Sequence, residues 1–312
     1  MEERLKELLK QALKLNASDI HFNLYNQQLV IELRIGKNIK KIRTKKNDDK
    51  LLAYLQYLAN FDVSNQIKPQ TGQFEMEVNH THLSIRFAYM QTYSNISGVL
   101  RILNHKLKLD LATLSAFSKQ NNYFQKLVKE DNGLILISGA TGSGKTTTLY
   151  TFLKALSMKK VFTIEDPIEI YFQEFVQLQI NQQIGLNYQA ALKQLLRHDP
   201  DVIVIGEIRD QSTADVAIRA AMTGHLVLAT IHASSALATI YRLQEYEVSE
   251  ILIKELLISI INQELVITKQ QKRAIYEIIS KKDLDYYFKN QRLPRTFHNK
   301  NYYLQKALAT SV

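Results

Sequence analysis

A glycine-rich stretch between two structured segments carries the clearest chemistry in this sequence. Residues 139–146 read GATGSGKT, directly after an apolar run at 134–137 and before a helical segment that begins TTLY. Glycines let such a loop turn tightly, so that backbone N–H groups and a helix N-terminus face the phosphates of a nucleotide. In this pattern Lys145 binds the β- and γ-phosphates and the Thr146 hydroxyl is a ligand for Mg²⁺. We therefore predict a P-loop that binds ATP and Mg²⁺ through Gly139, Ala140, Thr141, Gly142, Ser143, Gly144, Lys145, Thr146 and Thr147.

Acidic residues end two further apolar runs. The run at 202–205 leads to Glu207, and the run at 161–164 leads to Glu165 and Asp166. The carboxyl ends of parallel strands lie where α/β sheets bind ligands. Glu207 is therefore predicted to hold the water shell of Mg²⁺, and one carboxylate of the other pair to orient or deprotonate the attacking water. Taken alone, each would also fit a carboxylate that merely ends a strand.

Two histidines, His225 and His232, flank the apolar run at 226–230. No third histidine has matching spacing and cysteine is absent, so the pair does not indicate a zinc site. A lone histidine near a strand end is often structural. Because this strand belongs to the nucleotide-binding sheet, we interpret His232, at its carboxyl end, as a sensor of the γ-phosphate.

Composition narrows the class of protein. With 312 residues, 46% of them hydrophobic and 22% charged, the chain is a globular protein of about two domains. Zero cysteines exclude a disulfide framework and a thiol nucleophile. The most hydrophobic stretch, 251–267, is interrupted by charged residues, so no membrane-spanning helix is expected. The opening residues alternate leucines with charges at helical spacing, which indicates an amphipathic helix rather than a signal peptide.

The net charge of +10 suggests an anionic partner, such as a nucleotide, a nucleic acid or a lipid surface. The densest basic run, residues 37–46, contains no aromatic residue that could stack on bases. We interpret it as a solvated hairpin rather than a nucleic-acid-binding patch.

Hydrophobic patterning divides the chain into two parts. Alternating apolar and polar residues predict an α+β domain at 1–105, and a linker or hinge follows at 106–116. From there to residue 312, apolar runs alternate with helical segments, which is typical of buried parallel strands in an α/β domain, and the region beyond about residue 248 is expected to be helical. The buried strands of this second domain are expected at 134–137, 161–164, 202–205 and 226–230.

Together these segments resemble the secretion ATPase family that powers type II secretion, type IV pili and DNA-uptake pseudopili. The resemblance covers most of the chain and includes the N-terminal ASDIH segment at 17–21. The P-loop alone is common to many families, whereas the three later boxes in this order and spacing are specific. The boxes are GATGSGKTTTLY at 139–150, TIEDPIE at 163–169, LLRHDPDVIVIGEIRD at 195–210 and TGHLVLATIHASSA at 223–236.

The resemblance implies a homohexameric ring with a RecA-like P-loop ATPase core and a smaller, PAS-like N-terminal domain. It implies that arginines of the N-terminal domain, here Arg86 and Arg101, reach the nucleotide and neutralise charge on the transferred phosphoryl group. A surface ion pair is the alternative for either arginine. It also implies a cytoplasmic motor that is peripheral to the inner face of the cell membrane and acts on an inner-membrane platform protein.

Roles within the site follow from the same resemblance. Glu165 corresponds to the catalytic base, and Glu207 to the carboxylate on the water shell of the metal. Arg209 follows that carboxylate in the family pattern, and His225 and His232 belong to the histidine box.

Departures from the family pattern point to one branch of it. The chain has no cysteine for a zinc insert, no further N-terminal domain is expected, and the 249–312 region lacks the AIRNLIRE segment of retraction ATPases. Residues 176–181 look like the assembly branch, and the short architecture is most similar to the competence ATPases of Gram-positive bacteria. Lys68 and Glu264 stand where the family has arginines, so a bidentate arginine clamp is not expected at either position.

The sequence thus predicts a Mg²⁺-dependent ATPase motor that assembles a competence pseudopilus for DNA uptake without binding DNA directly. One alternative is a retraction motor or another type II secretion ATPase. A second is a RecA-like nucleic-acid translocase, which the positive charge would suit. A third is a non-catalytic, nucleotide-dependent interaction protein, which the complete set of hydrolytic residues disfavours.

Overall fold

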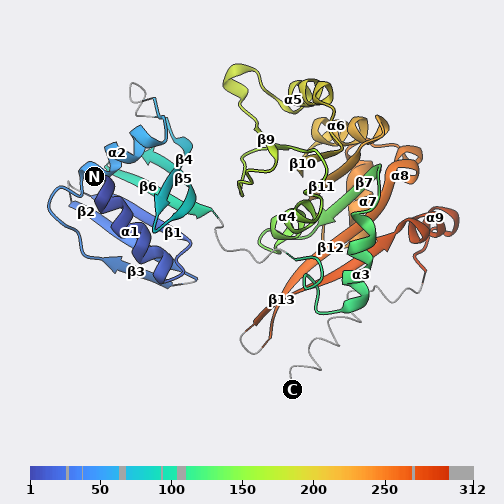
Figure 1. Cartoon of the computed structure of the whole chain (residues 1–312), viewed down its shortest axis with the longest axis horizontal. Helices are drawn as coiled ribbons and strands as arrows, with labels where there is room; N and C mark the ends of the chain where they lie inside the picture. Colours follow the sequence, from blue (N-terminus) through green and yellow to red (C-terminus); the bar gives the residue numbers. More distant parts are fainter. Residues whose placement is uncertain are drawn as a thin grey trace. The chain divides into compact units, whose positions relative to one another are not determined.

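A computed structural model gives the fold of the chain in two compact units, Met1–Leu107 and Lys108–Val312 (Figure 1). The predicted linker at 106–116 lies partly outside the described residues, and its role as a hinge stays a prediction. None of the helices in the described ranges is long and apolar enough to cross a membrane. The structure describes residues 1–25, 28–36, 38–62, 68–92, 94–103, 110–268 and 271–294.

The N-terminal unit is a six-stranded antiparallel sheet with two helices, in the strand order β3-β2-β1-β6-β5-β4. This is the predicted α+β fold. Leucines at helical spacing on the first helix are buried with inward-facing residues of the strands, such as Phe22 and Leu33. The elements are α1 (Glu2–Lys14), β1 (Asp19–Tyr25), β2 (Gln28–Ile35), β3 (Asn38–Ile42), α2 (Lys50–Leu58), β4 (Gln70–Val78), β5 (Thr81–Gln91) and β6 (Asn95–Leu103).

Part of the basic run, residues 38–42, forms β3, the edge strand of this sheet, where residues 38–41 are exposed. Residue 37 lies outside the described residues, and residues 43–46 follow the strand. Strand β3 pairs with β2 as the second half of a hairpin. Lysines on an edge strand discourage pairing with another sheet. The geometry matches the solvated hairpin predicted for this segment.

The second unit is a seven-stranded sheet in the order β13-β12-β7-β11-β10-β8-β9. Every recorded pairing within it is parallel except that of β12 with β13. The elements are α3 (Ser118–Leu127), β7 (Gly133–Ser138), α4 (Lys145–Ala155), β8 (Val161–Glu165), β9 (Val176–Gln179), α5 (Tyr188–Leu195), β10 (Val202–Ile208), α6 (Gln211–Met222), β11 (Leu226–Ile231), α7 (Ala236–Glu245), α8 (Glu250–Leu256), β12 (Leu257–Thr268), β13 (Gln271–Ser280) and α9 (Lys281–Asn290), with short 3-10 turns at Gln182–Ile184 and Leu196–His198.

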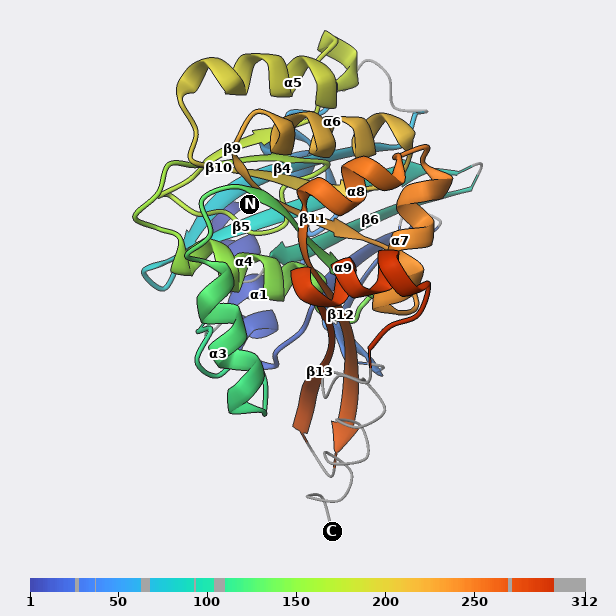
Figure 2. The ribbon, with the colours of Figure 1, turned by 90° about the vertical axis from the view of Figure 1, so that its right-hand side faces the viewer.

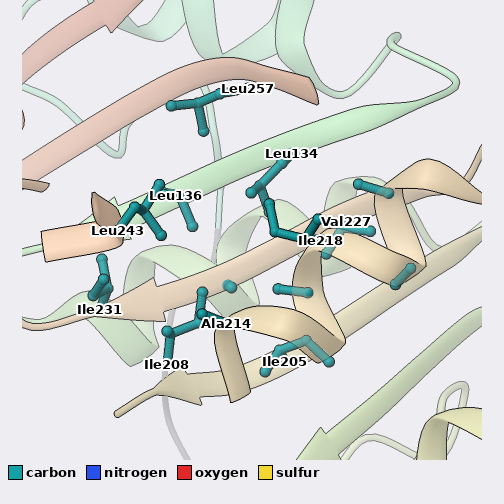
Figure 3. Close-up of a cluster of buried hydrophobic side chains, with 14 of the residues drawn as sticks. Leu134, Leu136, Ile205, Ile208, Ala214, Ile218, Val227, Ile231, Leu243 and Leu257 are labelled. Atoms are coloured by element: carbon teal, nitrogen blue, oxygen red, sulfur yellow. The ribbon is translucent and has the colours of Figure 1, made fainter. Parts of the chain in front are cut away.

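Both faces of this sheet are covered, which explains the uninterrupted apolar strands. On one face, Leu134 and Leu136 of β7 pack in a core with residues of α5 to α9 (Figure 3). The helices α3 and α4 cover the other face, where Phe124 stands edge-on to Phe152 and Tyr276. The four strands predicted from apolar runs are β7, β8, β10 and β11, and they lie side by side with β9 at one edge.

The C-terminal region differs from its expected helical structure between Leu257 and Ser280. Here the chain forms the long hairpin of β12 and β13, which Figure 2 shows as two neighbouring strands. The polar residues that interrupt the apolar run include Asn262 and Gln263, which are buried and hydrogen-bonded to neighbouring strands and helices. A sequence pattern alone cannot show that such residues will be satisfied, because their hydrogen-bonding groups lie far away in the chain.

The turn after β7 passes very close to β12. This close approach can be tested by substituting glycines of the turn. A Cβ added to Gly139 would lie 2.4 Å from the Gln263 carbonyl oxygen, whereas one added to Gly142 would meet nothing within 4 Å. Both glycines have positive φ, so alanine strains the backbone at each, but only Gly139→Ala also forces two backbone segments apart. We expect a loss of unfolding free energy of about 3 kcal/mol for Gly139→Ala and about 1 kcal/mol for Gly142→Ala. Urea denaturation without nucleotide checks this, and equal losses would contradict it.

Candidate nucleotide-hydrolysis site

The P-loop connects β7, in the interior of the sheet, to the N-terminus of α4. Its three glycines, Gly139, Gly142 and Gly144, have φ values of 149°, 77° and 90°. These values lie in the region that glycine adopts without a Cβ penalty. The loop therefore has the backbone conformation for which the glycines were predicted to be needed.

Gln263 of β12 holds the start of α4, which directly follows this loop. Its side-chain oxygen accepts a hydrogen bond from the Thr148 hydroxyl at 2.6 Å, and the Tyr276 hydroxyl lies 3.0 Å from the same Thr148 oxygen. All three side chains are buried. Buried polar groups that satisfy one another rigidify their surroundings, so the first turn of α4 is fixed against the β12–β13 hairpin.

Lys145, the first residue of α4, turns back over the loop. Its Nζ donates to the carbonyl oxygens of Gly139 at 3.0 Å and Ala140 at 3.1 Å, and lies 3.5 Å from Nδ1 of His232. The side chain is buried, and burial lowers the pKa of Lys145 from its ordinary value. The two carbonyl oxygens stabilise this ammonium only through their dipoles. The charged phosphate oxygens of a nucleotide would stabilise it more strongly.

Glu207, near the end of β10, lies between two basic side chains. Its Oε1 is 2.6 Å from His232 Nε2, and its Oε2 accepts from Arg209 Nε at 2.5 Å. Arg209 also donates to the carbonyl oxygen of Asp166 at 3.5 Å. The side chains of Lys145, His232, Glu207 and Arg209 thus form one continuous chain of contacts across the carboxyl ends of the strands.

Glu165, the last residue of β8, is only 4% exposed. Its carboxylate accepts hydrogen bonds from Tyr150, Thr163 and Gln177. Burial raises the pKa of Glu165, although the three donors oppose the rise by stabilising the charged form. A carboxylate with a raised pKa at this edge of the sheet suits general-base chemistry near neutral pH.

These side chains surround one cavity of about 330 Å³. Thr146 and Glu207 both line it and provide the hydroxyl and carboxylate oxygens that Mg²⁺ prefers. The residues therefore fit a magnesium nucleotide, with the metal on Thr146 and, through water, on Glu207, where it would neutralise charge on the phosphates. The cavity is lined by Thr141, Gly142, Lys145, Thr146, Leu149, Tyr150, Glu165, Asp166, Pro167, Glu169, Tyr188, Gly206, Glu207, Arg209, Thr230 and His232.

Eight of the predicted site residues line this cavity: Thr141, Gly142, Lys145, Thr146, Glu165, Glu207, Arg209 and His232. The other P-loop residues, Gly139, Ala140, Ser143, Gly144 and Thr147, adjoin them in the chain without lining the cavity, and His225 lies apart from it. That residue precedes β11, at the opposite end of the strand from His232, and its Nδ1 lies 2.8 Å from Thr223 Oγ1. Its carbonyl accepts from the Gly133 amide at the start of β7, so it helps to align two strands at their amino ends.

Arg86 and Arg101 belong to the N-terminal unit, where they are paired in register on β5 and β6. Arg101 Nε donates to Asp19 Oδ1 at 2.7 Å, so the alternative of an ion pair holds for this arginine. Its side chain is 57% exposed all the same. The predicted role of both arginines at the nucleotide stays a prediction.

Three residues near the nucleotide loop were not predicted as functional. Tyr150 and Gln177 both hold Glu165, and Gln263 holds the start of α4. Tyr150 is the last residue of the GATGSGKTTTLY segment, but a tyrosine on a helix is normally interpreted as a core residue. For Gln177, on β9, the signal in the sequence is an amide between two apolar residues, Val176 and Leu178.

Burial of Glu165 predicts a specific pH dependence of folding stability. A folded-state pKa above the ordinary 4.5 means that the unfolded state loses its proton first as pH rises. This contribution to stability is present below about pH 4.5 and is lost as pH rises through the folded-state pKa. Relative to Glu165→Gln, the wild-type protein should lose about 1.4 kcal/mol of unfolding free energy for each unit by which the pKa is raised. Chemical denaturation of both proteins between pH 4 and 8 measures this, and a constant difference would contradict it.

Comparison with known proteins identifies the family of this chain. The family model described as type II/IV secretion system protein matches residues 1–300. The competence protein ComGA of Bacillus subtilis is 35% identical over 271 residues, 85% of this chain and 76% of that protein. ComGA of Halalkalibacterium halodurans is 39% identical over 270 residues, 85% of this chain and 78% of that protein. The type II secretion system ATPase E of Vibrio cholerae is 33% identical over 269 residues, and the chain spans only 54% of its length.

Solved structures show the same fold. The pilus retraction motor PilT with bound ADP superposes with a TM-score of 0.75 at 28% identity, covering 98% of this chain and 93% of the motor. The ATPase DotB of Legionella pneumophila gives a TM-score of 0.73 at 24% identity, which supports the fold alone. The RecA-like core predicted from the sequence is thereby confirmed. The chain belongs to the type II/IV secretion system protein family and is an ATP-hydrolysing secretion ATPase.

Proposed function

We propose that this protein is a homohexameric, Mg²⁺-dependent motor that assembles a competence pseudopilus for DNA uptake. The observation that carries the proposal is its similarity to two competence proteins, 35% and 39% identical, over about three quarters of their length. The type II secretion relatives named ATPase E and protein E are similar in sequence, but the chain spans about half of each. Sequence identity to the two competence proteins favours the competence branch.

The cavity supports hydrolysis rather than nucleotide binding alone. Lys145 and the loop amides would hold the phosphates, Thr146 and Glu207 the metal, and Glu165 would take the proton of the attacking water. His232, between Lys145 and Glu207, would report the presence of the γ-phosphate. Each requirement of the reaction has a side chain at the same cavity.

The remaining parts of the proposal concern assembly. Arg86 and Arg101 would complete the site with cationic groups from the N-terminal unit, and an inner-membrane platform protein would receive the motion of the ring at the cytoplasmic face. DNA would not be a direct ligand. The exposed basic strand β3 lacks the interleaved aromatic residues that would stack on bases.

A pilus retraction motor is the second candidate. The 28% identity and TM-score of 0.75 to PilT, over nearly the whole chain, favour it specifically. Both candidates share the cavity and its chemistry, so they differ in the direction of the motor and not in the hydrolytic step.

Hydrolysis by the purified protein tests the core of the proposal. Lys145→Ala removes the ammonium that binds the phosphates, and Glu207→Gln removes the charge that holds the metal, so each should lower kcat at least about 100-fold. Glu207→Gln should still bind a fluorescent ATP analogue within about fivefold of wild type, because the P-loop is intact. The wild-type protein should form a hexamer by light scattering, with a rate that added DNA leaves unchanged.

Two results would contradict this proposal. Stimulation of the rate by DNA, with a steep loss at higher salt, would make the protein a nucleic-acid translocase. Nucleotide binding by a monomer that shows no turnover, even with membranes of the source bacterium added, would make it a non-catalytic switch.

Mixing inactive variants tests whether the site is shared between subunits. Arg101→Ala removes a group expected in trans, and Lys145→Ala one that acts in cis. Mixed rings contain some sites that combine the Lys145 of one variant with the Arg101 of the other, so about a quarter of the wild-type rate should return at equal ratio, by random pairing. Arg43→Ala, on the same unit outside the strands, serves as the control and should be active alone. Mixtures that stay inactive would contradict a site shared between subunits.

A further inference from the structure

The carboxylate of Glu165 is held more firmly than a residue that merely ends a strand requires. The hydroxyl of Tyr150 donates to Oε2 at 2.6 Å. The hydroxyl of Thr163 donates to Oε1 at 2.6 Å, and Nε2 of Gln177 donates to Oε1 at 3.2 Å. An ionised carboxylate has about four acceptor positions, of which three are used here. Among the described residues only Tyr150 is recorded as a donor to Oε2, so the remaining position is on that oxygen.

Tyr150 is itself fixed in place. Its ring stacks on Phe172 with centroids 5.2 Å apart and planes 12° from parallel. Its hydroxyl oxygen accepts from Gln177 Nε2 at 3.1 Å. Burial and the neighbouring charge of Glu165 raise the pKa of the Tyr150 phenol, so it keeps its proton and acts as a donor to the carboxylate. The helix that begins at the P-loop therefore reaches Glu165 directly.

Gln177 connects the same carboxylate to the segment between β8 and β9, residues 166–175. Its Oε1 accepts from the Phe172 amide at 2.7 Å, and its Nε2 donates to the Ile170 carbonyl at 2.9 Å. Because Nε2 has only two hydrogens, the second is shared between Glu165 Oε1 and the Tyr150 hydroxyl oxygen. This segment also supplies Pro167 and Glu169 to the wall of the cavity. A single side chain thus ties the cavity wall to the candidate base.

We infer that Tyr150 and Gln177 are positioning residues for hydrolysis: they hold Glu165 so that Oε2 accepts the proton of the attacking water. As the water oxygen bonds to the γ-phosphorus, its O–H bond breaks and the proton passes to Oε2. The bond from phosphorus to the bridging oxygen breaks at the same time, and its electron pair leaves with ADP. This inference rests on the proposed role of Glu165 as the base.

Other ionisable groups near the carboxylate set the background for its titration. Glu169 of the 166–175 segment and Tyr188 of α5 line the same cavity, and the charge of Glu169 adds to the raised pKa of Glu165. Neither makes a recorded hydrogen bond to it among the described residues. Substitutions at Tyr150 or Gln177 leave both of these groups in place.

Tyr150→Phe tests the inference because it keeps the ring stacked on Phe172 and removes only the hydroxyl, which donates to Oε2 of Glu165 and accepts from Gln177. We expect kcat to fall about tenfold while KM for ATP stays within about twofold of wild type. Loss of a donor to the charged form favours the protonated carboxyl group, so the acidic limb of the kcat profile should move up by about one pH unit. A purely structural tyrosine would leave that limb where it is.

The second test compares two glutamines on the same strand. Gln177→Met removes the amide that contacts Glu165, whereas Gln179→Met removes one that accepts from the Ile168 amide at 3.3 Å and holds the same segment. Only Gln177→Met should lower kcat, by about fivefold, and shift the acidic limb. Thermal unfolding of both variants separates misfolding from altered chemistry.

Glu165→Gln is measured beside these variants to separate the inference from its premise. Inactivity of Glu165→Gln together with a wild-type profile for Tyr150→Phe would overturn the positioning roles and leave the base in place. Wild-type turnover by Glu165→Gln would overturn both. If Gln177→Met and Gln179→Met lower kcat equally and neither shifts the acidic limb of the kcat profile, Gln177 has only a structural role.

Discussion

The close contact between the P-loop and β12 constrains everything else at the site. The carbonyl oxygen of Gln263 lies 2.4 Å from where a Cβ of Gly139 would be, and the side-chain nitrogen of Gln263 lies 2.8 Å from where a Cβ of Gly144 would be. Both ends of the P-loop therefore pack against Gln263. That residue is in place because β12 runs parallel to β7, with Asn262 opposite Ser138. Any movement of β12 along β7 would move the phosphate-binding amides with it.

Electrostatics imposes the second constraint. Lys145, His232, Glu207 and Arg209 follow one another within contact distance, so the one carboxylate lies between basic groups. Glu207 contacts His232 and Arg209, and Lys145 donates to the loop carbonyls of Gly139 and Ala140. A phosphate must therefore replace existing contacts of Lys145 rather than fill an unsatisfied site. Such exchange limits the gain in free energy on binding and suits a motor that must release its product.

The parts of the site that sequence could predict are those determined by local geometry. A glycine loop between a strand and a helix, and a carboxylate such as Glu207 at a strand end, depend only on neighbouring residues and on the parallel sheet. The same reasoning identified four buried strands but gave a helical structure to β12 and β13. Gln263 and Gln177 escaped prediction for one reason: each amide is satisfied by groups far away in the chain or in an irregular segment. Pairing at that distance depends on the tertiary structure.

The ion pair of Arg101 with Asp19 is compatible with the role proposed for this arginine at the nucleotide. Asp19 is buried and also accepts from the Ser18 hydroxyl, so its carboxylate is fixed before it meets Arg101. It engages Arg101 at Nε, and more than half of the arginine side chain stays exposed. A guanidinium held at Nε still presents its two terminal nitrogens to an anion, and it loses less side-chain entropy when it binds one. An ion pair of this geometry leaves the terminal nitrogens available to a phosphate, so its presence is no argument against the proposed role.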